Sequence, residues 1–167
     1  MSRYFFLERD YSEGDIMITF EYHQSLELLQ EGKESKLKTI PYIGMNDSDY
    51  ITSGINIFSH KFKNFIESMN IKNVNFIPIT ISQENHQRKD FYLLKFTQHE
   101  DCIDDEKSDI VIIQGLIRKI NKLKIKDDFN NFFFQIKGLK LRIAVNEKMK
   151  QMIESKNFHG IKFFEIE

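Results

Sequence analysis

Six carboxylates crowd into ten residues of the chain, which makes the stretch 100–109 its most acidic part. They are Glu100, Asp101, Asp104, Asp105, Glu106 and Asp109. Oxygens at this density could bind a divalent cation, serve a hydrolytic centre, or attract a basic protein partner. The stretch lacks the regular ligand spacing and central glycine of a calcium loop. Because charge runs usually form solvated surface, a solvated loop is the first interpretation of it.

A metal-dependent hydrolase or nuclease is the alternative that this carboxylate cluster leaves open. Such a centre would need a further acid, for which Asp10 or Asp15 is available, and a lysine on a neighbouring strand. The nearest pattern, Glu34-Ser35-Lys36, falls in the charged stretch 32–38, which we expect to be a loop. Metal soaks or calorimetry would separate this alternative from a binding protein.

Other sequence signals of catalysis are missing. The chain has no P-loop, no dinucleotide-binding glycine pattern, and neither the HExxH nor the GxSxG motif. Its histidines show no metal-ligand spacing. The lone cysteine, Cys102, lies three residues after His99 in the charged stretch, and we interpret that proximity as accidental. We therefore predict no catalytic residues, no metal and no cofactor.

Composition limits the remaining classes of protein. The chain has 167 residues, 41% of them hydrophobic, and a formal net charge of −1. That length is typical of one domain with its own core, and a near-neutral chain is not a typical nucleic-acid binder. One cysteine cannot form an internal disulfide, and no apolar run is long enough for a membrane span or signal peptide. We expect a soluble cytoplasmic protein that contacts neither nucleic acid nor membrane.

Two stretches of the chain resemble one another at a constant offset of 87 residues. Ile57–Phe76 and Ala144–Phe163 share seven of twenty aligned residues. In each, a polar residue at the N-cap position (Ser59, Asn146) precedes apolar residues spaced for one face of a helix, and a strand pattern follows. The identical pairs are Lys61/Lys148, Lys63/Lys150, Ile66/Ile153, Glu67/Glu154, Ser68/Ser155, Asn70/Asn157 and Phe76/Phe163. We predict two pseudo-repeated helix–strand units.

The rest of the chain is mainly strand-like, so the predicted class is α+β with a largely antiparallel sheet. Strands are expected at 3–7, 15–22, 91–96, 132–136 and 139–145, a short helix at 25–31, and polar connections at 32–38, 41–49 and 82–89. Pro78 cannot donate to a sheet ladder and suits an edge position.

A series of short motifs in residues 54–167 resembles a known family. The motifs are Tyr92-Leu93-Leu94, Ile103-Asp104 with Ser108, Lys122-Leu123 with Ile125, Phe133-Phe134-Gln135-Ile136, Val145–Lys150 and Gly160–Phe163. In this order they resemble the bacterial polymorphic-toxin immunity proteins, namely the eleventh of the numbered immunity families, of myxobacterial type and formerly a domain of unknown function. Gln135 stands where the family usually has Arg, and Asn146 where it has Ser. Residues 1–53 match weakly and form a variable N-terminal part of a single domain spanning 1–167.

The resemblance implies a non-enzymatic protein that binds and neutralises a cognate toxin domain, and that is a monomer or weak dimer when free. An interaction module of a larger assembly is a further alternative. We predict that toxin binding involves the acidic residues Glu100, Asp101, Asp105, Glu106 and Asp109, which would steer a basic partner. The family-motif positions are Tyr92, Ile103, Asp104, Ser108, Phe134, Gly160 and Phe163. Of these, Asp104 and Ser108 are interpreted as a turn whose side-chain oxygens satisfy loop amides.

Overall fold

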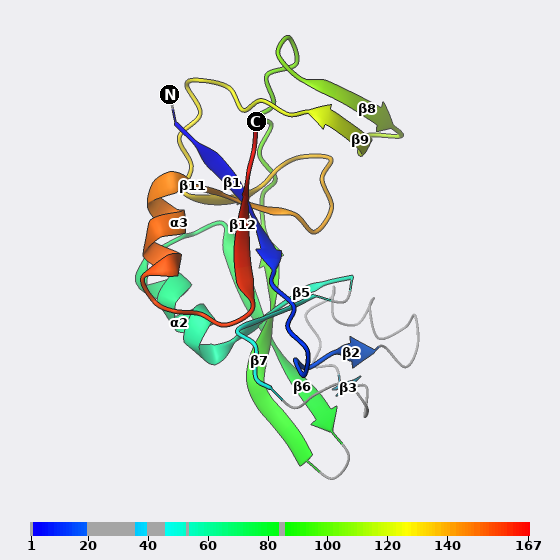
Figure 1. The fold of residues 1–167 in the computed structure, drawn as a ribbon, viewed down its shortest axis with the longest axis vertical. Coiled ribbons are helices and arrows are strands. Elements are labelled where there is room, and N and C mark those ends of the chain that lie inside the picture. The colour runs from blue at the N-terminus through cyan, green and yellow to red at the C-terminus, as the bar shows by residue number, and fades with distance from the viewer. Residues whose placement is uncertain (1, 20–35, 40–45, 53, 84–85) are drawn as a thin grey trace. The chain divides into compact units, whose positions relative to one another are not determined.

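The computed structural model describes every residue except 1, 20–35, 40–45, 53 and 84–85 (Figure 1). The helix expected at 25–31 and parts of the loops expected at 32–38 and 41–49 lie outside the described residues. No helix among the described residues is long and apolar enough to cross a membrane.

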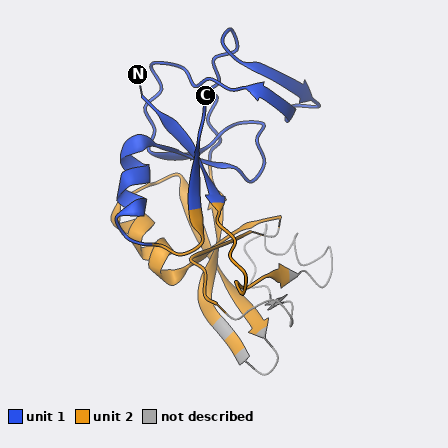
Figure 2. Ribbon diagram, in the orientation of Figure 1, with its two compact units in different colours: residues 1–8, 98–157, 162–167 blue, residues 9–97, 158–161 orange. Residues whose placement is uncertain are grey.

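The chain forms two compact units and passes between them several times (Figure 2). The first unit contains residues 1–8, 98–157 and 162–167, and the second contains residues 9–97 and 158–161. The acidic stretch 100–109 thus belongs to the first unit, and the repeat window 57–76 belongs to the second. The single domain expected over 1–167 stays a prediction.

The second unit is built on a six-stranded sheet. Its strand order is β2 (Ile18–Thr19), β3 (Lys36–Thr39), β6 (Val74–Gln83), β7 (His86–Phe96), β5 (Asn56–Ser59), β4 (Tyr50–Thr52). All of these pairs are antiparallel except β3 with β6. Isoleucine, leucine and phenylalanine side chains from these strands form a buried cluster that includes Ile57, Ile79 and Phe91.

The first unit contains a four-stranded and a two-stranded sheet. The larger has the order β10 (Phe133–Gln135), β11 (Ile143–Asn146), β1 (Tyr4–Arg9), β12 (Ile161–Glu165), and the smaller pairs β8 (Asp109–Ile113) with β9 (Leu116–Lys122). The core of this unit includes Tyr4, Phe134 and Ala144 from the larger sheet. The described fold is α+β and mostly antiparallel, as the sequence predicts.

Within the described residues each unit carries one short helix, and both helices begin as their sequences predict. In α2 (His60–Ser68) the Ser59 hydroxyl accepts from the Phe62 amide at 3.2 Å. In α3 (Glu147–Glu154) the Asn146 side chain accepts from the Met149 amide at 2.8 Å. The inward residues are also as predicted: Phe62, Phe65 and Ile66 are buried in α2, and Met149 and Ile153 in α3. The caps and the apolar stripes of both helices are therefore confirmed.

Identical residues of the two repeat windows make equivalent contacts. The ammonium of Lys63 lies 2.6 Å from Glu67, and that of Lys150 lies 2.9 Å from Glu154. The hydroxyls of Ser68 and Ser155 each donate to the carbonyl three residues earlier, at 2.6 and 2.7 Å. Asn70 and Asn157 both have positive φ, 58° and 51°.

The strands around the two helices also follow the same order. The series β4-β5-β7-β6 around α2 corresponds to β10-β11-β1-β12 around α3. In both, the strands before and after the helix are separated by a third strand, which is β7 in the second unit and β1 in the first.

Four expectations about strands and connections need correction. The polar connection expected at 82–89 is wrong for its described residues, because β6 continues to Gln83 and β7 begins at His86. Lys36–Thr39 is a strand rather than loop, since it gains a partner in β6. In 139–145 only Ile143–Asn146 is strand, preceded by Leu141 at φ 66°. The strand β6 that contains Pro78 is not an edge strand, but β3 pairs with it only from Thr80 onward.

Gly160 is a glycine at which both the backbone and the surroundings restrict substitution. It has φ +79°, and a Cβ there would lie 2.0 Å from the Ser48 hydroxyl oxygen. That hydroxyl donates to the Tyr50 carbonyl at 2.7 Å, so it cannot move without losing a buried hydrogen bond. A left-handed backbone also disfavours any L side chain.

We therefore expect Gly160→Ala to lower the free energy of unfolding by roughly 2–3 kcal/mol. Gly54→Ala is the matched control, because Gly54 has φ +74° with nothing within 4 Å of the added Cβ. Its cost should be the conformational part alone, roughly 1 kcal/mol. Urea unfolding of both variants measures the difference, and equal losses would show that the contact with Ser48 is unimportant.

Candidate functional site

The acidic stretch lies between β7 and β8 and is held to its own unit by the backbone. The Glu100 amide donates to the Gln135 carbonyl at 2.8 Å, and the Lys126 amide donates to the Cys102 carbonyl at 2.9 Å. Cys102 and Ile103 are buried in the core of the first unit. The stretch is thus a loop, as interpreted, but it is anchored in the core through Cys102 and Ile103, while residues 105–107 are exposed.

Asp104 and Ser108 form the turn that the sequence suggests. The Asp104 carboxylate accepts from the Lys107 amide at 3.2 Å. The Ser108 hydroxyl accepts from the Lys124 amide at 2.9 Å and donates to the Lys124 carbonyl at 3.3 Å. A hydrogen bond from the Lys107 side chain is the main cause that lowers the pKa of Asp104. These two side chains therefore shape the loop, which leaves its other acids to face outward.

Nearby lysines and asparagines compensate several of the acids. The ammonium of Lys137 lies 3.8 Å and that of Lys126 lies 4.0 Å from the Asp101 carboxylate. Lys107 lies 3.0 Å from both Asp104 and Asp127. Lys126 and Lys137, which are distant in the sequence, therefore oppose the acidic stretch together with its own Lys107.

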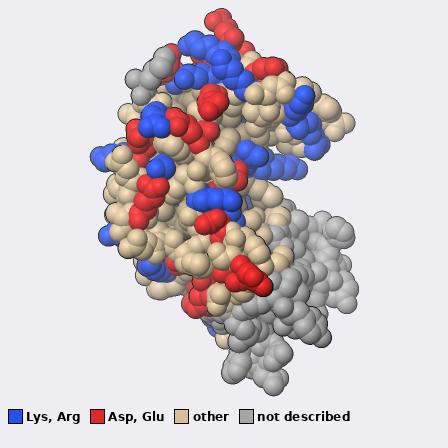
Figure 3. Space-filling model, in the orientation of Figure 1, with Lys and Arg blue, Asp and Glu red and all other residues tan. Residues whose placement is uncertain are grey.

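Two further acids of the loop accept hydrogen bonds from amide side chains. The Asn131 amide donates to Glu100 at 3.1 Å, and that of Asn121 donates to Asp109 at 2.9 Å. Asp105 and Glu106 remain exposed and have no polar side-chain partner among the described residues. Across the visible face of the protein, cationic and anionic side chains are interspersed (Figure 3). Uncompensated negative charge in this loop is thus concentrated at Asp105 and Glu106.

Cys102 is unsuited to be a nucleophile. It is fully buried, and burial, reinforced by the charge of Glu100, raises the pKa of its thiol to about 12. The thiolate form is therefore scarce at neutral pH. The interpretation of the His99–Cys102 spacing as accidental agrees with this burial.

The alternative metal centre finds little support in the geometry. The described residues contain no group of three or more His, Cys, Asp or Glu side chains placed to hold a metal ion. Asp10 and Asp15, the acids proposed to complete it, belong to the second unit. Lys36 lies in β3, while Glu34 and Ser35 lie outside the described residues.

A contact between the buried Asp15 and the half-exposed His159 is a feature that sequence reasoning missed. The Asp15 carboxylate is fully buried, lies 3.1 Å from Nε2 of His159, and accepts from the Ser12 amide at 2.8 Å. Burial alone would raise the pKa of Asp15. The Ser12 amide, the His159 contact and the charge of Arg9 outweigh that effect and lower the pKa below its usual value. No local spacing signals this pair, because 144 residues separate its members.

His159 also lies in a well-anchored segment of the second unit. Its amide donates to the Asp49 carboxylate at 2.8 Å, and the Asp49 amide donates to its carbonyl at 2.9 Å. The same Asp49 accepts from the hydroxyl of Ser59, the N-cap of α2, at 2.5 Å. We interpret the Asp15–His159 pair as part of this anchoring, which positions Gly160.

The remaining family-motif positions are placed for packing. Phe134 is fully buried and its ring packs edge-on against Tyr4 and Phe129. The Tyr92 hydroxyl lies 3.3 Å from His60, and the ammonium of Lys63 lies 5.1 Å from its ring centre. Phe163 lies half-buried with Lys150 at 5.8 Å. None of these three side chains is arranged for chemistry.

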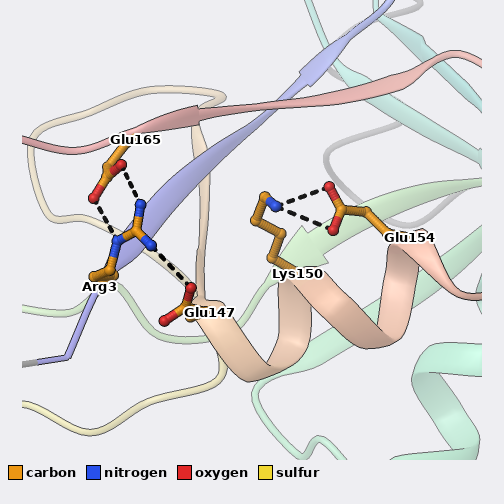
Figure 4. A network of polar contacts seen from close by, with 5 residues as sticks. All are labelled: Arg3, Glu147, Lys150, Glu154 and Glu165. Atoms are coloured by element: carbon orange, nitrogen blue, oxygen red, sulfur yellow. Dashed lines mark hydrogen bonds and ion pairs between the residues drawn. The ribbon is translucent and has the colours of Figure 1, made fainter.

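A second ionic cluster that sequence reasoning missed ties three elements of the first unit together (Figure 4). The Arg3 guanidinium donates twice to Glu165, at 2.6 and 2.7 Å, and once to Glu147 at 3.1 Å. These side chains come from the start of the chain, β12 and α3. All are about half exposed, so we interpret the cluster as surface structure rather than a site.

The comparison with protein families agrees with the order of the motifs. The model of a family described as "Immunity protein family (Imm11)" matches residues 10–167 of the chain. A comparison with curated proteins finds none that matches. The match includes most of residues 1–53, which were expected to form a variable N-terminal part.

Proposed function

Because the chain belongs to the Imm11 immunity protein family, we propose that it binds a cognate toxin domain and neutralises it by stoichiometric contact, without catalysis. The observation that carries this proposal is the family match over residues 10–167. The residues of the site must support it as well, because proteins that share a fold can have different functions.

The chemistry of the described residues supports binding rather than catalysis. The one cysteine is buried and its thiol has a raised pKa. The acids of the loop are bonded to neighbouring lysines and asparagines instead of converging on a common point. A charged loop held rigidly by buried residues is well suited to recognition, because little ordering is required when the partner binds.

The probe that tests the proposal is a cognate toxin domain, to be sought among the genes that neighbour this one. Mixed with this protein, it should form an equimolar complex in size-exclusion chromatography with light scattering, and the cells that carry it should survive only when the protein is present. Protection without any complex would point to an enzymatic or indirect mechanism and would contradict binding.

We also propose that the acidic loop faces the toxin. Glu100, Asp101, Asp105, Glu106 and Asp109 remain the proposed binding residues, and Asp105 and Glu106 are the two without a side-chain partner. Their unpaired charge is available to attract a basic surface and to speed encounter. Phe132 is 41% exposed and follows Asn131, which bonds Glu100, so it is a suitable aromatic anchor near the start of the loop.

Reversing the two free charges provides the test of this surface. The double variant Asp105→Lys/Glu106→Lys breaks no contact among the described residues, so its melting temperature should be unchanged. Its association rate with the toxin should fall about tenfold at low salt, and the difference should shrink as ionic strength rises. Stopped-flow fluorescence measures both.

The matched control is Glu13→Lys/Glu167→Lys, which changes the net charge equally at two exposed acids outside the loop. It should associate at nearly the wild-type rate. Equal slowing by both variants would mean that only net charge matters. An unchanged rate in the loop variant would place the interface elsewhere.

We further infer that the two helix–strand units are copies of one structural unit. The equivalent caps, lysine–glutamate pairs and strand orders described above support this inference. A crystal structure tests it: Ile57–Phe76 should superpose on Ala144–Phe163, helix on helix and strand on strand, at the offset of 87 residues. A different angle between helix and following strand in the two windows would contradict it.

A further inference from the structure

The hairpin of β8 and β9 exposes an unusual run of aliphatic side chains. Val111, Ile112 and Ile113 are 42%, 56% and 52% exposed. The hairpin closes through Gln114 and Gly115, which both have positive φ, 52° and 73°. That pair is typical of a two-residue type I′ turn, which sets Ile113 opposite Leu116. Further from the turn, the antiparallel pairing of β8 and β9 is interrupted by register shifts between Val111 and Ile112 and between Asp109 and Ile110. The exposed run is thus a fixed strand rather than an irregular loop.

The outer edge of β9 is covered by its own unit. The Ile117 amide donates to the Gly138 carbonyl at 3.0 Å. Ile117 and Ile120 of β9, together with Ile110 of β8, pack against the core cluster of the first unit. One edge and one face of the hairpin therefore already have partners.

The outer edge of β8 has no strand partner within the described part of the chain. This sheet has only two strands, and no backbone hydrogen bond is formed on that side of β8. Proteins usually protect such an edge with charges, a proline or a covering element. Here β8 after Asp109 is entirely aliphatic (Ile110–Ile113). The edge is therefore open to an added strand.

Backbone alternation identifies the group that such a strand would meet. In a two-residue hairpin the residues flanking the turn, Ile113 and Leu116, bond to each other. The next pair, Ile112 and Ile117, directs its amides and carbonyls outward. The Ile117 amide does point outward, since it bonds Gly138. On β8 the corresponding amide of Ile112 is free to bond a partner.

The acidic residues next to β8 indicate the chemistry of the segment that would pair with this strand. The open strand begins at Asp109 and follows directly on the turn that carries the unpaired Asp105 and Glu106. A complementary segment would be extended and apolar, with lysine or arginine at the end that lies beside these acids. A second copy of β8 fits less well, because that strand brings no cation of its own.

We propose that β8 accepts an extended, apolar segment of the toxin as an added strand, with the basic end of that segment beside Asp105 and Glu106. This inference rests on the proposed function and adds to it the mode of contact. Main-chain hydrogen bonds along β8 would supply affinity, and the acidic turn would set the position of the segment.

Proline at position 112 tests the edge with little effect on the hairpin itself. Ile112→Pro removes an amide that does not bond β9, and proline is tolerated where a strand amide faces solvent. With the cognate toxin domain that forms a complex with the wild-type protein as probe, the dissociation constant of the variant should rise at least about tenfold, which corresponds to about 1.4 kcal/mol. Ile112→Val keeps the amide and the β-branched shape, so it should bind within about threefold of wild type.

Hydrogen exchange of the wild-type protein gives a readout that does not depend on the variant folding. The Ile112 amide should exchange rapidly in the free protein and become protected in the toxin complex. The Ile113 amide, which bonds Leu116, should be protected in both states. An Ile112 amide that stays unprotected in the complex, or a proline variant that binds normally, overturns the added strand.

Two other outcomes are distinguishable. A wild-type protein that forms no complex with the toxin contradicts the proposed function, and the added strand with it. A free protein that is a dimer, and that Ile112→Pro converts to a monomer, would assign the β8 edge to self-association and overturn the inference while leaving toxin neutralisation intact.

Discussion

Burial of a short helix against its sheet is the constraint on which each unit depends. α2 has nine residues and α3 has eight, and helices of that length are marginal in water by themselves. Each therefore needs its cap, and each must bury its stripe, formed by Phe62 and Ile66 in one and by Met149 and Ile153 in the other. The third strand between the flanking strands widens the sheet that receives the stripe.

Several charged side chains of the first unit form ion pairs with neighbours in the same unit. The acids of the loop that remain without such a partner are therefore confined to a small part of its surface. Arg3 joins β12 and α3, while Lys107, Lys126 and Lys137 compensate the acidic loop. Exposed pairs of this kind add little stability, but they compensate the acids of the loop other than Asp105 and Glu106. The unpaired acids and the open aliphatic strand lie next to each other in the sequence. Electrostatic attraction by the acids and apolar contact with the strand can therefore act on the same partner.

A rigid scaffold suits this mode of recognition. The loop is held through Cys102 and Ile103 in the core and through the Asp104–Ser108 turn, and the hairpin is held by its turn and by Gly138. A preorganised surface loses little conformational entropy on binding, so more of the contact energy appears as affinity. The family-motif positions that lie in the core or in turns are explained by this scaffold, since their side chains pack or form turn hydrogen bonds.

The sequence by itself determined the features that depend on neighbours along the chain. The caps at Ser59 and Asn146, the helical stripes, the Asp104–Ser108 turn and the burial pattern of α2 all follow from local spacing, and the order of motifs led to the family. Tertiary structure decided what depends on partners distant in the sequence. It made Lys36–Thr39 a strand, paired Asp15 with His159, covered the edge of β9 and left that of β8 open. The physical reason is that a strand edge or a buried charge pairs with residues that the fold brings beside it from distant parts of the chain. The spacing of residues along the chain does not contain that information.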